Sequence, residues 1–174
     1  HEGSTKFGAN YKWGNFPAFS LGWNVTNEEF MQHVDFLNNL KLRLGFGITG
    51  TVPTDPYISL KKLDTGDNFY TGNGWISTLK PKSNTNPDLR WEKKEEWNLG
   101  FDYALFNNFI RGSFDLYKRT TKDMLWNYTV PMPPYLYDKM IVNAGTMENK
   151  GFEAQVIVTP VRTKEFTWNS TVNY

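Results

Sequence analysis

Cysteine is absent from the 174 residues of this chain, so a disulfide framework and thiolate chemistry are excluded. Long apolar runs are also missing, and no stretch approaches the roughly 20 apolar residues that a membrane-spanning helix needs. The formal net charge is only +1, so we expect no nucleic-acid partner. Helical membrane proteins are therefore excluded, but membrane barrels are not, because the lumen-facing half of each barrel strand is polar.

Signatures of cofactor and metal chemistry are missing as well. The chain has no phosphate-binding loop, and Gly45-Phe-Gly47 lies in a strand-like run rather than at a strand-to-helix turn. The two histidines, His1 and His33, have no second ligand at a metal-binding spacing. We therefore expect no catalytic residue, no metal site and no cofactor.

Aromatic residues, in contrast, make up 17% of the chain. They are frequent in two alternating runs within residues 91–121 that meet at Asn107-Asn108, the hairpin around which the chain is organised. Asparagine tolerates positive φ, so this pair suits a two-residue hairpin turn. With that turn, Phe101 lies opposite Phe114, and the large apolar residues of both runs share one face.

The same register makes further pairs on the two strands. It places Glu96 opposite Arg119, and it lets Tyr103 cover the bare backbone at Gly112. The apolar face continues for about nine residues per strand, which is enough for a tilted strand to cross a bilayer. A membrane hairpin with one lipid face and one wet face explains this pattern. A soluble β-sandwich also alternates, so the hairpin alone does not decide between them.

Other segments alternate in the same way. Strands are predicted at residues 16–24, 39–49, 151–159 and 166–174, in addition to 91–105 and 109–121 of the hairpin. The last two are joined by a predicted turn at Pro160 to Glu165. Between the first two, Thr26-Asn-Glu-Glu29 has the form of a capping box and predicts a short helix.

The connections between these strands differ in length in a regular way. Residues 50–90 and 122–150 have no sustained period, whereas the other connections are short. Counting strand directions places every long connection on one side and every short one on the other. Greek-key sandwiches have no reason to keep this asymmetry, but outer-membrane barrels have it. We therefore predict an all-β fold, an antiparallel up-and-down transmembrane β-barrel segment with long extracellular loops and short periplasmic turns.

This prediction assigns a face to each strand residue. The smallest transmembrane barrels have about eight strands, so the sequence is expected to be a piece of a longer protein. The residues predicted to face lipid are Leu42, Leu44, Phe46, Leu99, Phe101, Tyr103, Phe114, Leu116, Phe152, Val156 and Trp168. The residues predicted to face the lumen are Arg43, Glu96, Asp102, Arg111, Asp115, Glu153 and Gln155. The lumen carboxylates are interpreted as wall residues and ion pairs rather than as a glycosidase pair, because a water-filled lumen does not bury an acid.

Four stretches resemble a known family. They are Phe7-Gly8 through Pro17 and Trp23, Leu40 through Gly50, Asn86-Pro-Asp-Leu-Arg-Trp-Glu92 through Asp102, and Asn143-Ala-Gly145 through Gly151 with Glu153. In order and spacing they resemble the barrel of SusC-type TonB-dependent outer-membrane transporters. The resemblance implies that residues 1–174 are a partial TonB-dependent receptor β-barrel domain, with the plug and the remaining strands outside this chain.

The family resemblance also implies partners and a location. It implies import of oligosaccharide or peptide cargo across the outer membrane of a Gram-negative bacterium. The partners implied are a SusD-like surface lipoprotein, the TonB–ExbB–ExbD complex acting through the absent plug, and the lipid bilayer. Loop aromatics are candidates for contact with cargo or with the lipoprotein, and loop self-packing is their alternative role. These candidates are Tyr57, Tyr70, Trp75, Trp126, Tyr128, Tyr135 and Tyr137.

Two other functions stay open at this point. A siderophore-type TonB-dependent receptor has the same architecture without a lipoprotein lid. A secreted β-sandwich carbohydrate-binding module also carries aromatic loops, but it is soluble without detergent.

Overall fold

The computed structural model describes residues 1–31 and 33–174, and these residues divide into two units. The sheet unit contains Pro17–Ile48, Glu95–Thr120 and Glu148–Tyr174. The loop unit contains His1–Phe16, Thr49–Lys94 and Thr121–Met147. Each unit is assembled from three separate stretches of the sequence, because the chain passes from one to the other through its long strands.

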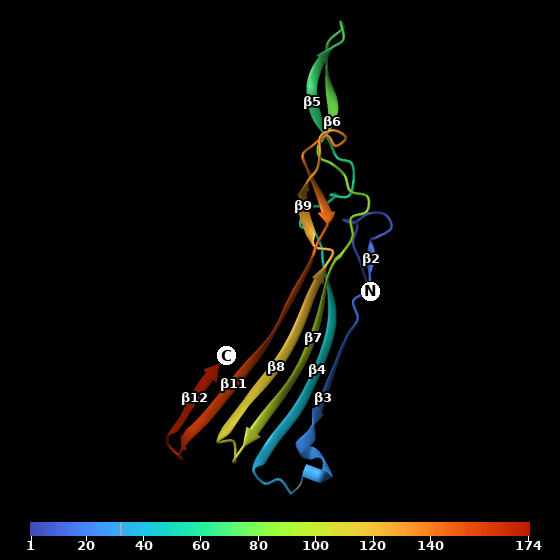
Figure 1. Cartoon of the computed structure of the whole chain (residues 1–174). Coiled ribbons are helices and arrows are strands. Elements are labelled where there is room, and N and C mark those ends of the chain that lie inside the picture. The colour runs from blue at the N-terminus through green and yellow to red at the C-terminus, as the bar shows by residue number, and fades with distance from the viewer. Residues whose placement is uncertain (32) are drawn as a thin grey trace. The chain divides into compact units, whose positions relative to one another are not determined.

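Six strands form one sheet in the described part of the chain, in the order β12-β11-β8-β7-β4-β3. Neighbouring strands run in alternate directions (Figure 1), so the predicted antiparallel up-and-down order is confirmed. All six predicted strands are present. Their bounds are β3 Ala18–Asn24, β4 Leu37–Thr51, β7 Glu92–Leu105, β8 Ile110–Lys122, β11 Thr146–Arg162 and β12 Thr167–Asn173.

The turn between β7 and β8 matches its prediction. Asn107 and Asn108 have φ of 55° and 64°, and the Phe109 N–H donates to the Phe106 carbonyl at 3.1 Å. Two central residues with positive φ give the tight turn whose twist matches that of paired strands. As that register requires, the rings of Phe101 and Phe114 lie 5.6 Å apart between centroids.

The turn between β11 and β12 is shorter than predicted, and its predicted start at Pro160 is wrong. Pro160 lies inside β11, and the turn is closed by the Thr163 N–H, which donates to the Phe166 carbonyl at 2.8 Å. The pairing of β11 with β12 shifts register between Val158 and Val161. A proline is tolerated at such an irregularity because the ladder there does not need its missing N–H.

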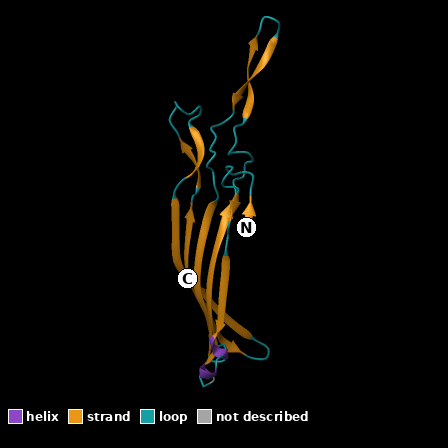
Figure 2. Ribbon diagram, turned by 90° about the vertical axis from the view of Figure 1, so that its right-hand side faces the viewer, coloured by secondary structure: helices purple, strands orange, loops and turns teal. Residues whose placement is uncertain are grey.

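The short helix predicted here is present only as 3-10 turns, and its predicted cap at Thr26 is wrong. The segment forms two single-turn 3-10 helices, η1 Val25–Asn27 and η2 Glu29–Met31, shown in purple in Figure 2. Strand β3 ends at Asn24, which therefore takes the N-cap position, and Thr26 falls inside η1 instead of capping it. No helix among the described residues is long and apolar enough to cross a membrane.

The long connections contain strands that the sequence pattern did not predict. In one, β5 Leu63–Tyr70 pairs with β6 Trp75–Pro81, and in the other β9 Leu125–Thr129 pairs with β10 Lys139–Asn143. A register shift in the first pair, between Thr65 and Asn68, interrupts the alternation that would have revealed it. A third small pair, β1 Glu2–Gly3 with β2 Trp13–Gly14, lies near the start of the chain.

The buried core lies in the loop unit. Phe7, Leu89 and Trp91 are almost completely buried there, and the rings of Phe7 and Trp91 lie 4.7 Å apart. Next to this core, the backbone of Gly8 lies so close to Pro87 that no side chain fits. A Cβ at this position would lie 1.7 Å from the Pro87 carbonyl oxygen. Two of the stretches that carry the family resemblance, around residues 7 and 89, therefore contribute side chains to one small core.

Candidate functional site

A charge cluster connects three neighbouring strands on one face of the sheet. Arg43 of β4 donates from Nη2 to the carboxylates of Asp102 on β7 and Asp115 on β8, each at 3.0 Å. The Asp115 side chain is the most sheltered of the three. The guanidinium of Arg43 therefore forms ion pairs with both carboxylates. This arrangement is the opposite of a glycosidase pair, in which one carboxyl must hold a proton.

A second ion pair lies on the same face. Arg119 donates to both carboxylate oxygens of Glu96, at 3.0 Å from Nε and 2.9 Å from Nη2. This bidentate pair confirms the cross-strand partner predicted for Glu96. The pair borders a polar hollow of about 370 Å³, together with Asp115 and Glu153. The two charge clusters therefore share one surface.

The other predicted lumen residues lie beside these clusters. Arg111 and Gln155 border a hollow of about 400 Å³ together with Asp102. Gln155 also donates to the side chain of Asn173 on β12 at 3.0 Å. The structure therefore brings all seven predicted residues onto one polar face of the sheet. That this face lines a lumen remains a prediction.

The opposite face is apolar, and aromatic rings touch across the strands. The Phe114 ring, which contacts Phe101, also lies 5.9 Å from the ring of Phe152 on β11. The ring of Phe152 lies 5.2 Å from that of Tyr174. On the same apolar face, on the strands nearer β3, the Phe46 ring lies 4.5 Å from that of Trp97. Rows of apolar rings stabilise neighbouring strands laterally without burying either strand.

Exposure agrees with the predicted lipid face. Leu44, Phe46, Tyr103 and Phe114 are partly buried against neighbouring side chains. The other predicted lipid-facing residues, all large and apolar, are exposed: Leu42, Leu99, Phe101, Leu116, Phe152, Val156 and Trp168. Such a wide apolar surface is unusual in a water-soluble protein and marks an interaction face.

Asparagine side chains hold the loop unit together. Asn143 accepts from the Arg90 N–H at 2.9 Å and donates to the carbonyls of Arg90 and Asp123 at 2.7 and 2.9 Å. Asn86 donates to the Ile141 carbonyl at 2.9 Å. Asn84 makes four such contacts with backbone groups of residues 136–139. These side chains replace a β-ladder between segments that have irregular backbones.

An ion pair reinforces the same junction. Arg90 Nη2 lies 2.7 Å from Asp123 Oδ1. The hydrogen bond to the Asp123 carboxylate raises the pKa of Arg90 further above its ordinary value. The guanidinium of Arg90 therefore stays charged, and its ion pair with Asp123 links the two long connections.

The loop aromatics do not form one cluster. Tyr70 and Trp75 stack near the tip of the β5–β6 hairpin, with ring centroids 5.3 Å apart. Trp126 and Tyr128 are two residues apart on β9 and therefore share one side of that strand. The Tyr137 hydroxyl donates to the Pro81 carbonyl, which gives this residue a packing role. The exposed candidates are Tyr57, Tyr70, Trp75, Trp126, Tyr128 and Tyr135, and their role in binding remains a prediction.

One feature of the loop unit carried no sequence signal. A hollow of about 320 Å³ is bordered by Lys62, Lys82 and Lys139, which come from the bases of two hairpins. The Lys82 N–H donates to the Lys62 carbonyl at 2.9 Å, which brings two of the lysines together. Across residues 1–31 and 33–174, no group of His, Cys, Asp and Glu could hold a metal ion.

Comparison with known proteins places this geometry in context. The family model described as TonB dependent receptor-like, beta-barrel matches residues 1–174. The TonB-dependent receptor SusC of Bacteroides thetaiotaomicron is 37% identical over 176 residues, which cover 99% of this chain and 17% of that protein. The TonB-dependent receptor P39 of Formosa agariphila is 36% identical over 173 residues, which cover 99% of this chain and 16% of that protein. The chain therefore spans about one sixth of the length of these relatives.

Solved structures with a similar fold are known. The RagAB peptide importer in its closed-closed state matches with a TM-score of 0.83 and 27% identity, covering 98% of this chain and 18% of that one. Its open-open state matches with a TM-score of 0.84 and 26% identity, covering 97% and 18%. The arrangement of strands found here is thus shared with an importer of known structure.

Proposed function

Because the chain belongs to the TonB dependent receptor-like β-barrel family, we propose that it is part of an outer-membrane active transporter for nutrients. In this proposal residues 1–174 are one portion of the barrel domain, and the plug and the remaining strands lie outside this chain. The transporter acts by binding and gating, and the barrel wall carries out no bond chemistry. TonB, with ExbB and ExbD, supplies energy through the plug.

The observation that carries the proposal is the opposite character of the two sheet faces. One face carries Arg43, Asp102 and Asp115 in contact with each other, and the other carries exposed rings such as Phe101 and Phe152. A strand wall with ion pairs on one side and large exposed apolar groups on the other suits a barrel in lipid. The secreted β-sandwich alternative is wrong, because the whole chain matches a β-barrel family model.

The proposed cargo is an oligosaccharide or a peptide, and the proposed partner is a SusD-like surface lipoprotein. The resemblance to SusC-type transporters implies the first cargo class and the lipoprotein, and the similarity to a peptide importer supports the second class. The exposed rings of Trp75, Trp126 and Tyr128 on the long connections suit contact with either partner or cargo. The proposed location is the outer membrane of a Gram-negative bacterium.

The first test is membrane partition of the native protein. Outer membranes are washed with carbonate and extracted with detergent, and the band that carries this sequence is examined for heat-modifiable mobility and intact mass. We expect a heat-modifiable, detergent-dependent species much larger than 20.2 kDa that co-purifies with a lipoprotein. A soluble species of that mass would overturn the proposal. Recovery of the barrel without any lipoprotein, together with binding of a ferric siderophore, would favour the siderophore-type receptor instead.

The second test concerns the loop aromatics. A double substitution, Trp126→Ala with Tyr128→Ala, removes two exposed rings from β9 without touching the buried core. We expect less lipoprotein to co-purify with the full-length transporter, or weaker uptake of cargo. Lys164→Ala, in the short turn between β11 and β12, is the matched control and should change neither. Normal co-purification and uptake in the double variant would remove β9 from the proposed contact surface.

A further inference from the structure

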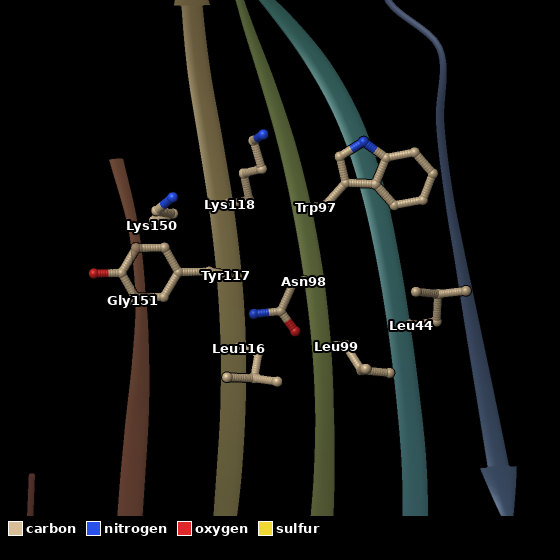
Figure 3. Close-up of a pocket in the computed structure, with 9 residues that line it drawn as sticks. All are labelled: Leu44, Trp97, Asn98, Leu99, Leu116, Tyr117, Lys118, Lys150 and Gly151. Carbon is tan, nitrogen blue, oxygen red and sulfur yellow. The ribbon is translucent and has the colours of Figure 1, made fainter. Parts of the chain in front are cut away.

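A shallow groove lies on the apolar face of the sheet unit, across β4, β7, β8 and β11 (Figure 3). Its volume is about 440 Å³, and its apolar lining comes from Leu44, Trp97, Leu99 and Leu116. Two lysines, Lys118 and Lys150, complete the lining together with Asn98, Tyr117 and Gly151. We propose that this groove binds one anionic, phosphate-bearing lipid, with an acyl chain along the leucines and the phosphate at the two lysines. This inference rests on the membrane location proposed above.

The apolar part of the groove offers a surface on which an acyl chain can bind. Leu99 and Leu116 are 53% and 45% exposed, so about half of each side chain is available for contact. Trp97 forms a wall, and its ring is held in place by the Phe46 ring at 4.5 Å. A preformed apolar wall lets a chain be ordered by contact instead of by rearrangement of the protein.

The charged part of the groove contains two ammonium groups that face the same carboxylate. Lys118 Nζ lies 3.0 Å from Glu148 Oε2, and Lys150 Nζ lies 3.8 Å from Glu148 Oε1. Two ammonium groups thus share one carboxylate, and each keeps N–H donors that this carboxylate does not use. An anionic phosphate can accept hydrogen bonds from these donors, and its charge complements the ammonium groups, whereas a headgroup without net charge lacks this complement.

Polarity changes along the strands in a single direction. On β8 the order away from the Asn107-Asn108 turn is Leu116 and then Lys118, and on β7 it is Leu99 and then Trp97. Residues two apart on one face are separated by about 7 Å, given a rise of about 3.3 Å per residue. On each strand the side chains therefore change from apolar to polar or amphipathic within about 7 Å. A lipid shows the same change between its acyl chains and its headgroup.

The position of Trp97 fits the same boundary. Its indole N–H donates to Glu95 Oε1 at 3.2 Å, while its ring packs on the apolar face. Tryptophan gathers at the membrane–water interface because its ring and its N–H prefer different environments. The short turns are periplasmic in our proposal, so this end of the strands lies in the outer leaflet, where phosphate-bearing lipids are met.

Native mass spectrometry of the full-length transporter in mild detergent tests the inference. The wild-type protein should retain one phosphate-bearing lipid, and Lys118→Gln with Lys150→Gln should lower the retained fraction at least tenfold. Lys164→Gln, a lysine in the turn beyond the opposite end of β11, is the control and should retain the lipid. The mass of the released lipid distinguishes a phosphorylated glycolipid from a glycerophospholipid.

Two further variants exclude a folding defect as the cause. Lys118→Arg with Lys150→Arg keeps both charges and should keep the lipid. Glu148→Gln removes the carboxylate that competes for both lysines and should strengthen retention. In nanodiscs, phosphatidylglycerol should compete for the site and phosphatidylcholine should not. Equal retention in the Gln double variant and the wild type, or equal competition by both lipids, would overturn the inference.

The outcome also separates this inference from the proposed function. A transporter that fractionates with the outer membrane but retains no lipid at this groove contradicts the lipid site alone. A protein that is absent from the outer membrane contradicts the proposed function, and the lipid site with it.

Discussion

The loop unit and the sheet unit place their apolar side chains in opposite environments. In the loop unit Leu89 and Trp91 are 0% and 3% exposed, as in the core of a water-soluble domain. In the sheet unit Leu99 and Trp97, only a few residues further along the chain, are 53% and 42% exposed. Large apolar side chains are therefore buried in one unit and exposed in the other, and strand β7 has residues in both units. The difference fits the proposal that water surrounds the first unit and lipid the second.

The means of holding the backbone differ as well. Long strands in the sheet unit satisfy each other's N–H and C=O groups, as any backbone in lipid must. Segments in the loop unit are irregular and depend on asparagine side chains such as Asn84 and Asn143. Side-chain bonds of this kind suit a unit in water, where the remaining polar groups can be hydrated. Substitutions in the two units should therefore fail for different reasons.

The largest effect is expected for Trp91→Ala. This change removes the ring that packs on Phe7 and Phe16 and leaves a cavity, which costs about 3–5 kcal/mol. Hydrogen exchange in the full-length protein should show faster exchange of loop-unit amides and no change in β8. Trp91→Phe is the control and should lose less, because it keeps most of the packing. Equal exchange in wild type and Trp91→Ala would mean that this core does not hold the loop unit.

Phe101→Arg should have the next largest effect, and it acts through lipid. An arginine near the middle of a lipid face costs about 2–4 kcal/mol. Urea titration of the protein refolded into lipid vesicles measures the loss of stability. Phe101→Leu, which stays apolar, should cost clearly less. A stability unchanged by arginine would contradict the assignment of this face to lipid.

Asn143→Ala should have an intermediate effect on the loop unit. It removes one acceptor and two donors that join Arg90 and Asp123, and each such hydrogen bond contributes about 0.5–1.5 kcal/mol. Limited proteolysis on intact outer membranes should cut the long connections sooner in this variant. Asn173→Ala, at a polar side chain of β12, is the matched control and should leave the cleavage pattern as it is.

The smallest effect is expected for Asp102→Asn, next to Phe101. Its side chain is about one-third exposed, and Arg43 keeps Asp115 as a partner. Exposed ion pairs contribute only about 0–1 kcal/mol, so vesicle refolding should change little. The contrast with Phe101→Arg sharpens the comparison of faces, because the two positions are adjacent on one strand. Equal destabilisation by both substitutions would contradict the assignment of Phe101 to the lipid face and Asp102 to the lumen face.

The regular part of the molecule was predictable from sequence because its physics is local. Alternation with period two places Arg43, Asp102 and Asp115 on one face of their strands without any tertiary information. The Asn107-Asn108 turn then fixes which residues of β7 and β8 are opposite, so that Glu96 and Arg119 could be paired in advance. The family resemblance was confirmed over the whole chain.

Irregular segments were not predictable in the same way. The β5–β6 and β9–β10 pairs, the 3-10 turns after Asn24 and the place of Pro160 inside β11 all depart from the sequence prediction. In each case a register shift, a strand end or a distant partner sets the local backbone. A period of two cannot reveal these features, because they depend on which segments meet in space and not on the order of neighbouring residues.

The sequence by itself determined the two faces of each long strand, the direction in which the strands run and the tight turn between β7 and β8. Only the tertiary structure decided that Arg43 joins two carboxylates, that Asn143 ties the long connections together, and that Lys118 and Lys150 meet beside a groove of leucines. The physical reason is distance along the chain. Alternation and turns act between near neighbours, whereas these contacts join residues that only strand pairing and loop packing bring together.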